Sequence, residues 1–474
     1  MSETQKTHLA VVGAGPGGYA AAFMAADLGL EVTLIDVEAN PGGTCLYRGC
    51  IPSKALLHAA RLINDAREAR HWGVVFEAPD IHLGKLRENT QSVVAQMTAG
   101  LGQLCGARKV NYLQGRAHFV DSQTLAVFQV DGSEEVLQCA YAIVAAGSRP
   151  AMLGPLIDSP RIMNSTGALE LQDLPESLLV IGGGYIGLEL GTVYASLGSK
   201  VTVVEVTDGL LPGVDRDLVK PVAKRLEGLL EGVLLNTRVT EMKEQKNGIK
   251  VALDGPEVDR PTRLFDKVLV CVGRKPNASG LGLKSTKAEV DAHGFITVDR
   301  QMRTADPAIF AIGDIVGGAM LAHKASYEGR VAAEVIAGHN VSNEPMAIPA
   351  VVFSDPEIAW CGLSETEAKQ QGRPVEVSRF PWAASGRAAT LNRGEGHTKL
   401  LVDPDTKQVL GMAVVGAGAG ELIAEGVLAI EMGALASDLD LSMHPHPTLS
   451  ETVMEAAAAV YGHSTHIYRP KKRG

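Results

Sequence analysis

Two cysteines, Cys45 and Cys50, lie five positions apart in the segment that runs from Gly42 to Lys54. Two thiols this close together can form a disulfide that is readily reduced and re-formed. The alternatives are two buried free cysteines or half of a zinc site. A zinc site needs a second ligand pair at a suitable spacing, and we find none in the sequence. The pair therefore predicts redox chemistry at sulfur, and the sequence predicts no metal site.

The residues after Cys50 favour a helix that begins near Pro52, since proline is common in the first helical turn and the chain continues with alanines and leucines. Cys50 would then lie at a helix N-terminus. Free backbone N–H groups and the helix dipole stabilise a thiolate there, so we expect a lowered pKa for Cys50.

Just before the cysteines, the chain has the order strand, glycine turn, helix, strand, acid. The strands are expected at 9–12 and 32–35, and the helix at 19–28. The glycines and the acid are Gly13, Gly15, Gly18 and Asp36. Glycines in this pattern give a tight turn, a close approach to a pyrophosphate, and close helix–strand packing. The phosphates would lie at the helix N-terminus, and Asp36 would accept hydrogen bonds from a ribose.

The same unit recurs with strands at 178–181 and 201–204 and a helix at 185–197. Its glycines and acid are Gly182, Gly184, Gly187 and Glu205. Two dinucleotide sites in one chain indicate a flavoprotein that also binds a nicotinamide cofactor. An acid at position 205 favours the free 2′-hydroxyl of NAD, and the first arginine after it is Arg216. We therefore expect NAD at the second site.

The chain resembles the pyridine nucleotide-disulfide oxidoreductases over nearly its whole length. The motif from Gly43 to Lys54, with both cysteines, is highly specific for that family, and Thr304–Asp314 resembles its second flavin motif. Asp314 is thereby placed at the ribityl chain of FAD. The sequence departs from the family at Tyr47-Arg48, where Asn-Val is usual.

The resemblance implies further cofactor contacts. Beyond the first glycine unit and Asp314, it assigns to the FAD site Lys54, Gly115, Ala117, Gly147 and Ala322. Beyond the second glycine unit, it assigns to the NAD site Glu189 and Gly273. Lys54 and Glu189 correspond to an ion pair near the flavin, and a buried Lys needs such a partner.

The C-terminal motif His444-Pro-His446-Pro-Thr-Leu-Ser-Glu451 resembles the catalytic motif of the family. By that resemblance His446 is the base that activates a thiol, and Glu451 orients it. A carboxylate on the far ring nitrogen fixes the tautomer. From the residues alone, His444 is an equally good candidate for the base. The resemblance also implies that this histidine reaches the disulfide of the other subunit of a homodimer.

Within the family, the sequence looks like the branch that oxidises dihydrolipoamide and reduces NAD. The resemblance then implies lipoyl groups as partners, carried on the acyltransferase core of a 2-oxoacid dehydrogenase complex or on a glycine cleavage carrier protein. The enzymatic rival is a glutathione-reductase-like disulfide reductase. From another class, the rival is a flavin-bound structural or regulatory protein.

The motifs predict an α/β fold with two Rossmann-like dinucleotide-binding domains and a C-terminal α+β dimerisation domain. We expect an FAD domain at 1–150, an NAD domain at 151–276, a segment at 277–347 that completes the FAD domain, and an interface domain at 348–474.

The formal charge of −10 argues against binding to nucleic acid or to anionic membranes. The glycine-rich stretch 9–35 is a poor membrane span, and the polar start, Met1–Lys6, is not a signal peptide. Six cysteines are too sparse for a secreted disulfide scaffold. We therefore expect a cytoplasmic protein without membrane insertion.

Overall fold

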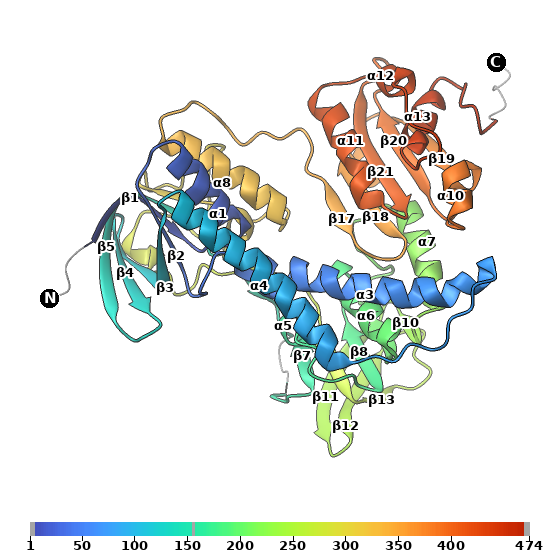
Figure 1. Cartoon of the computed structure of the whole chain (residues 1–474), viewed down its shortest axis with the longest axis horizontal. Helices are drawn as coiled ribbons and strands as arrows, with labels where there is room; N and C mark the ends of the chain where they lie inside the picture. Colours follow the sequence, from blue (N-terminus) through green and yellow to red (C-terminus); the bar gives the residue numbers. More distant parts are fainter. Residues whose placement is uncertain (1–4, 154–156, 469–474) are drawn as a thin grey trace.

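The structure is a computed structural model that describes residues 5–153 and 157–468. Residues 1–4, part of the polar start considered above, lie outside this range. The predicted α/β class is confirmed. Two sheets that contain parallel strands are followed by an antiparallel sheet near the C-terminus, and each has its own covering helices (Figure 1).

The first sheet is built on parallel pairings of the glycine-turn unit and extends into an antiparallel meander. Its strands are β1 (Gln5–Val12), β2 (Val32–Asp36), β3 (Asn111–Asp121), β4 (Thr124–Gln129), β5 (Glu134–Val144) and β16 (Ile309–Ala311). The long strand β3 pairs in parallel with β2, and β5 pairs in parallel with β1 and β16, while both pair antiparallel with β4. Through β16, part of the segment after 277 lies in the first sheet.

Helices α1 (Pro16–Asp27) and α8 (Ala322–Ile336) lie side by side against this sheet (Figure 1). Their backbones approach closely because a glycine of each helix, Gly17 of α1 and Gly329 of α8, lies at the contact. A Cβ at Gly329 would lie 2.5 Å from the carbonyl oxygen of Gly17. Three further helices follow β2, namely α2 (Gly43–Arg48), α3 (Cys50–Glu68) and α4 (Leu83–Ala107), and α3 is followed by the short η1 (Ala69–Trp72).

The second sheet is parallel and repeats the strand–turn–helix–strand unit. Its strands in spatial order are β10 (Gly232–Leu234), β9 (Lys200–Val204), β8 (Ser177–Ile181), β14 (Lys267–Val270) and β7 (Ile162–Asn164). Its helices are α5 (Ser165–Leu169), α6 (Tyr185–Leu197) and α7 (Arg216–Glu227). An antiparallel sheet adjoins it, with β11 (Arg238–Gln245), β12 (Gly248–Asp254) and β13 (Thr262–Phe265). Two short crossover strands lie where the chain passes between the first and second sheets. They are β6 (Ser148–Pro150) and β15 (Arg274–Pro276), and they pair with each other.

The C-terminal sheet is antiparallel, and its strands in spatial order are β17 (Ala350–Val352), β18 (Glu357–Gly362), β21 (Val409–Gly416), β20 (His397–Val402) and β19 (Glu376–Pro381). The helices of this part are α9 (Glu365–Gln371), α10 (Gly386–Thr390), α11 (Ala419–Glu431), α12 (Ala436–Leu441) and α13 (Glu451–Ala458). Short turns of 3₁₀ helix lie at η2 (Leu283–Ser285), η3 (Gly313–Val316) and η4 (Trp382–Ala384).

Aliphatic side chains dominate the buried core, as the low aromatic content predicts. The strand and helix positions expected from the two glycine units agree with the observed elements to within a few residues. The domain boundaries at 150, 276 and 347 remain predictions. Among the described residues, no helix is both long and apolar enough to cross a membrane.

Candidate active site

A cavity of about 790 Å³ runs between the first glycine turn, the cysteine segment and the start of α6. Its volume suits a large cofactor. Of the residues predicted for the flavin site, those that line it are Gly13, Gly15, Asp36, Lys54, Gly115, Ala117, Gly147, Asp314 and Ala322. Cys45, Cys50 and Glu189 line it as well. The cavity therefore brings the cysteine pair together with almost the whole predicted flavin set.

The three glycines of the first turn have different roles. Gly13 has φ of +100°, and a Cβ there would lie 2.4 Å from the carbonyl oxygen of Ala145. A Cβ at Gly18 would lie 1.8 Å from the carbonyl oxygen of Gly13, so Gly18 permits α1 to pack on the strand. At Gly15 the nearest atom would be 3.9 Å away, and Gly15 caps α1 without a side-chain hydrogen bond. The space beside Gly15 and the N–H groups of α1 fit the pyrophosphate of a dinucleotide.

The second turn repeats this geometry. Gly182 has φ of +109°, and a Cβ at Gly187 would lie 2.1 Å from the carbonyl oxygen of Gly182. A Cβ at Gly184, which caps α6, would have nothing within 4 Å. The second turn therefore also fits a dinucleotide. Gly182, Gly184, Gly187, Glu205 and Gly273 are not among the described residues that line the large cavity. The chain thus has two separate cradles.

The acid of each unit holds its own glycine turn. Asp36 Oδ2 accepts a hydrogen bond from Ala14 N at 2.6 Å, and Glu205 Oε2 accepts one from Gly183 N at 2.7 Å. Glu205 Oε1 also accepts from the backbone and hydroxyl of Thr207. Asp36 Oδ2 and Glu205 Oε2 each have a second lone pair with which they can accept from a ribose. Burial raises the pKa of Asp36, and the backbone N–H of Ala14 opposes that rise.

The two cysteines lie in different helices. Cys45 is in α2 and Cys50 is the first residue of α3, with only Gly49 outside both helices. A Cβ at Gly49 would lie 2.8 Å from the carbonyl oxygen of Thr44, so the tight joint needs glycine. Cys45 is half-buried and Cys50 is exposed. The expected position of Cys50 at a helix N-terminus is confirmed, and Pro52 lies in the first turn.

The two thiols differ in acidity because they hydrogen-bond to each other. That hydrogen bond lowers the pKa of Cys50 to about 6, and the positive charge of Lys54 acts in the same direction against burial. The same hydrogen bond, together with burial, raises the pKa of Cys45. In the dithiol state Cys50 is therefore the thiolate and Cys45 the thiol that donates to it.

Lys54 lies one turn after Cys50 on α3, and its Nζ is 2.8 Å from Glu189 Oε2 on α6. The Glu189 side chain is buried, and its Oε1 accepts from Phe353 N at 3.1 Å. Lys54 Nζ also lies 4.4 Å from the centre of the Phe353 ring. The ion pair inferred from the resemblance is thus present. Both residues line the large cavity, so Glu189, which the resemblance assigns to the NAD site, lies at the cavity wall beside Lys54.

The crossover strands carry polar contacts to Asp314. Asp314 accepts a hydrogen bond from Ser148 Oγ, and Arg274 donates to the same hydroxyl at 2.7 Å. Arg274 Nε lies 3.8 Å from Asp314 Oδ2. Gly147, immediately before Ser148, has φ of +65°. These contacts hold Asp314 at the cavity wall, where the resemblance places the ribityl chain.

His446 and Glu451 form the pair predicted from the C-terminal motif. His446 Nδ1 lies 2.9 Å from Glu451 Oε1, and Thr448 N donates to Glu451 Oε2 at 2.8 Å. Burial would raise the pKa of Glu451, but the Thr448 N–H and His446 outweigh it and the pKa is lowered. The side chain of His446 is 74% exposed, and the described residues offer no partner to its Nε2. His446 is thus oriented and available to an external group.

The structure distinguishes His446 from His444 as the candidate base, whereas the sequence alone does not. Nδ1 of His444 lies 2.8 Å from the carbonyl oxygen of Ser442, and its Nε2 lies 2.8 Å from Glu425 Oε1. Its side chain is only 7% exposed. Both ring nitrogens of His444 are occupied, so His446 is the candidate base. Neither His446 nor Glu451 is among the described residues that line the large cavity, so within one chain the histidine is not brought to the cysteines.

Sequence reasoning missed two features near the cavity. Burial, and then the charges of Cys45 and Cys50, raise the pKa of Tyr19 on α1. Arg48, between the cysteines, forms an ion pair with Glu38 after β2 and lines the cavity. The departure from the family at position 48 thus ties α2 to the first glycine unit. An acid two positions after Asp36 was the available signal.

Comparison with known proteins agrees with this geometry. Residues 7–329 match the family model described as pyridine nucleotide-disulphide oxidoreductase, and residues 348–457 match the dimerisation domain of the same family. The chain belongs to the pyridine nucleotide-disulphide oxidoreductase family.

Relatives with the same name cover the whole chain. The chain is 48% identical over 475 residues to the dihydrolipoyl dehydrogenase of Haemophilus influenzae. The aligned region covers 100% of this chain and 99% of that protein. It is 46% identical over 475 residues to that of Vibrio parahaemolyticus, with the same coverage.

Solved structures show the same fold. LpdA from Mycobacterium tuberculosis has a TM-score of 0.89 at 28% identity and covers 96% of this chain and 99% of its own. The HOCl-induced flavoprotein disulfide reductase RclA from Escherichia coli has a TM-score of 0.83 at 26% identity and covers 96% of this chain and 100% of its own.

Proposed function

We propose that this chain oxidises dihydrolipoamide to lipoamide and reduces NAD, with FAD as the resident cofactor and the Cys45–Cys50 pair as the redox disulfide. The carrying observation is the polarised cysteine pair at the wall of a dinucleotide-sized cavity, next to the ion pair of Lys54 with Glu189. The dihydrolipoyl dehydrogenase relatives support the substrate.

The residues present fit both cofactors. FAD would be held by the first glycine turn, Asp36, Gly115, Ala117, Gly147, Asp314 and Ala322, all but Gly18 at the cavity wall. NAD would be held by the second glycine turn, Glu205 and Gly273. FAD, when bound, supplies an acceptor that takes two electrons from the dithiol and passes them to NAD.

The sulfur chemistry follows from the different acidities of the two thiols. A substrate thiolate attacks Cys45 Sγ of the disulfide, and Cys50 leaves as a thiolate, which is the form its surroundings stabilise. The second substrate thiol, as thiolate, then attacks the substrate sulfur of the mixed disulfide. The S–S bond of lipoamide forms, and Cys45 is released. His446 Nε2, whose ring is fixed by Glu451, accepts the proton of each substrate thiol in turn; one of the two protons returns to Cys45, which is released as the thiol, and the other goes to solvent.

We propose that the active unit is a homodimer. His446 is exposed and oriented, lies away from the cavity of its own chain, and belongs to the part that matches a dimerisation domain. A two-fold dimer places the same surface of each subunit in both sites. The histidine of each subunit would then serve the cysteine pair of the other.

The second cradle favours NAD over NADP. Arg216, the first arginine after Glu205, donates to the carbonyl oxygens of Leu210 and Leu211 at 2.8 and 2.7 Å. Its guanidinium is thus committed to the backbone and is not placed for a 2′-phosphate. This speaks against a glutathione-reductase-like activity. The oriented His446–Glu451 pair and the acidic Cys50 speak against a flavin-bound structural or regulatory protein.

We propose lipoyl groups on the acyltransferase core of a 2-oxoacid dehydrogenase complex, or on a glycine cleavage carrier protein, as the partners. We also propose a cytoplasmic location, because a cysteine pair that alternates between disulfide and dithiol suits a reducing compartment.

The test of function is a steady-state comparison of dihydrolipoamide with NAD against glutathione disulfide with NADPH. We expect turnover with the first pair, and preference for the second would overturn the assignment.

A further inference from the structure

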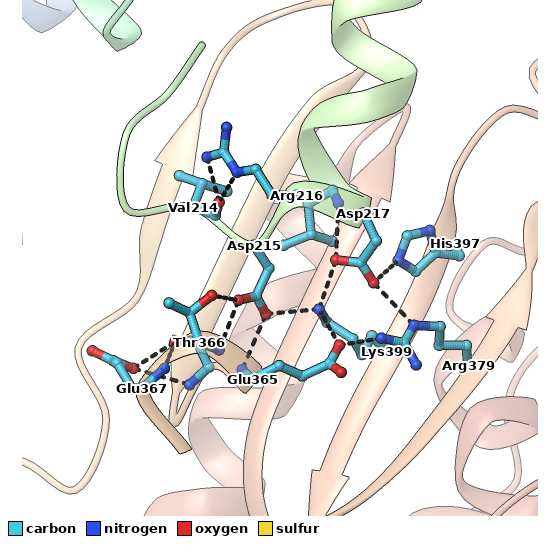
Figure 2. A network of polar contacts seen from close by, with 12 residues as sticks. Val214, Asp215, Arg216, Asp217, Glu365, Thr366, Glu367, Arg379, His397 and Lys399 are labelled. Carbon is cyan, nitrogen blue, oxygen red and sulfur yellow. Dashed lines mark hydrogen bonds and ion pairs between the residues drawn. The ribbon is translucent and has the colours of Figure 1, made fainter. Parts of the chain in front are cut away.

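Lys399 on β20 is a completely buried lysine far along the chain from either glycine unit. Figure 2 shows its ammonium group between three carboxylates. Nζ donates to Asp215 Oδ2 at 2.7 Å, to Asp217 Oδ1 at 2.9 Å and to Glu365 Oε1 at 2.8 Å. Since an unpaired ammonium in the interior is costly, all three of its donors are used.

The three acids lie within 4.8 Å of one another, a spacing that would also suit a metal ion. The ammonium of Lys399 bonds to all of them and takes the place of a cation. Arg379 Nε donates to Asp217 Oδ2 at 2.9 Å, and His397 Nε2 lies 3.3 Å from the same oxygen. Burial would raise the pKa of Asp217, but these neighbours outweigh it and the pKa is lowered. Asp217 is therefore ionised, and the cluster is held together by its own cations.

This cluster joins two parts of the molecule. Asp215 and Asp217 lie at the start of α7, which packs with the second sheet, whereas Lys399, Glu365 and Arg379 belong to the C-terminal sheet and its helix α9 (Figure 2). Asp215 also accepts from Thr366 N at 3.0 Å and from Thr366 Oγ1 at 2.6 Å. A buried charge cluster with this many hydrogen bonds fixes how α7 and the C-terminal sheet are oriented relative to each other.

A short chain of contacts leads from the cluster to the second glycine turn. Arg216, next to Asp215, bonds the carbonyl oxygens of Leu210, Leu211 and Val214, and so fixes the loop between Glu205 and α7. Leu211 N in turn donates to the carbonyl oxygen of Gly183 at 2.9 Å, and Gly183 N donates to Glu205 at 2.7 Å. The loop is thus fixed at the cluster and at the glycine turn.

We infer that Lys399 is a positioning residue for the NAD site, which it reaches through Asp215 and the Glu205–Asp215 loop. The C-terminal domain would then set the geometry of the second glycine turn, on which the adenosine half of NAD is bound. This inference rests on the proposed use of NAD. A lysine that only joins two domains would affect stability and leave nucleotide affinity unchanged, so the two roles are separable.

The test uses the FAD-loaded enzyme with Lys399→Met and, as matched control, Lys407→Met. Lys407 is in the same domain and pairs with Glu376 at 2.6 Å, but its contacts stay within that domain. ADP-ribose, which is NAD without its nicotinamide ring, is titrated by calorimetry, and reduction by dihydrolipoamide is followed by stopped-flow. For Lys399→Met we expect a dissociation constant raised about tenfold, with the rate of reduction within about twofold of wild type. Lys407→Met should change neither, and Lys399→Arg should recover most of the affinity.

An unchanged ADP-ribose affinity in folded Lys399→Met would overturn the inference, and so would an equal loss in both measurements. If Lys399→Met yields no folded holoenzyme, Thr366→Val decides. It removes only the hydroxyl bond to Asp215, so we expect an affinity about threefold weaker, and wild-type affinity would overturn the inference. Failure of the wild-type enzyme to bind ADP-ribose would instead overturn the proposed function, and with it this inference.

Discussion

Lys54 and Glu189 come from the two glycine-turn domains and meet at 2.8 Å beside the cysteine pair. Lys54 is one helical turn from Cys50 and is one of the groups that lower the pKa of that thiol. The pair therefore joins the cofactor domains and also tunes the sulfur chemistry.

Replacing Lys54 should weaken the Cys50 thiolate. In the reduced Lys54→Met enzyme we expect the pKa of Cys50 to rise by about one unit, or about 1.4 kcal/mol, because a stabilising charge is lost. The thiolate, which in the wild type persists below the pH of an ordinary thiol, would then be lost at a higher pH. The ultraviolet absorbance of the thiolate, followed against pH, measures the pKa of Cys50. Lys54→Arg keeps the charge and serves as control; an unshifted titration in Lys54→Met would contradict the role of Lys54.

Substitutions at two glycines of the first turn should have different effects. Gly15→Ala adds a methyl group that the protein tolerates but that lies in the flavin cradle, so we expect folded protein without bound flavin. Gly18→Ala places Cβ against the carbonyl oxygen of Gly13, and we expect it to destabilise folding by at least ~2 kcal/mol. Thermal unfolding and flavin content measured together check both, and a yellow, wild-type-like Gly15→Ala protein would be evidence against the first cradle.

Gly184→Ala should separate the two cofactors. Its Cβ meets no protein atom within 4 Å, so we expect the variant to fold and to retain flavin. NADH affinity should fall about tenfold or more because the added methyl group occupies the space beside the N-terminus of α6. Calorimetric titration with NADH is the measurement. Normal NADH binding would mean that the second turn is not the nicotinamide cradle.

Much of this arrangement is predictable from local patterns. Both strand–turn–helix–strand units are recognisable because Gly13 and Gly182 each need a positive φ, and Gly18 and Gly187 each need space for a helix. The position of Cys50 at a helix start follows in the same way from Pro52.

Other features depend on contacts between distant segments. His444 and His446 are equivalent in the sequence, and only the fold shows that Glu425 occupies one and leaves the other available. Lys399 and Asp215 are 184 positions apart, and no local pattern of charge indicates that they meet. The short helix that holds Cys45 is not predictable from the sequence, because a six-residue element with two adjacent glycines carries little helical pattern.

His446→Gln should slow dihydrolipoamide oxidation by roughly 10²- to 10⁴-fold, the range for loss of a general base. Reduction of ferricyanide by NADH requires no thiol exchange and should be almost unchanged. The matched control is His444→Gln, whose ring is already bonded to Glu425, and we expect its dihydrolipoamide activity to stay within about threefold of wild type. The reverse order of the two losses would assign the base to His444.

A mixed dimer tests whether the base acts between subunits. In a heterodimer of Cys50→Ser and His446→Gln chains, one site combines an intact cysteine pair with an intact histidine only if the histidine comes from the other subunit. We expect about half of the wild-type activity per dimer, whereas the Cys50→Ser homodimer is inactive and the His446→Gln homodimer is slowed by roughly 10²- to 10⁴-fold. An inactive heterodimer would place the histidine and the cysteines of one catalytic site in the same chain.

In the proposed reaction, electrons pass from dihydrolipoamide through the Cys45–Cys50 pair to the flavin and then to NAD. Anaerobic stopped-flow reduction by dihydrolipoamide follows this path. We expect a long-wavelength charge-transfer band in the wild type, its loss in Cys50→Ser, and its decay when NAD is added. A wild-type enzyme that shows no such band on reduction, or a Cys50→Ser enzyme that keeps it, would contradict this path.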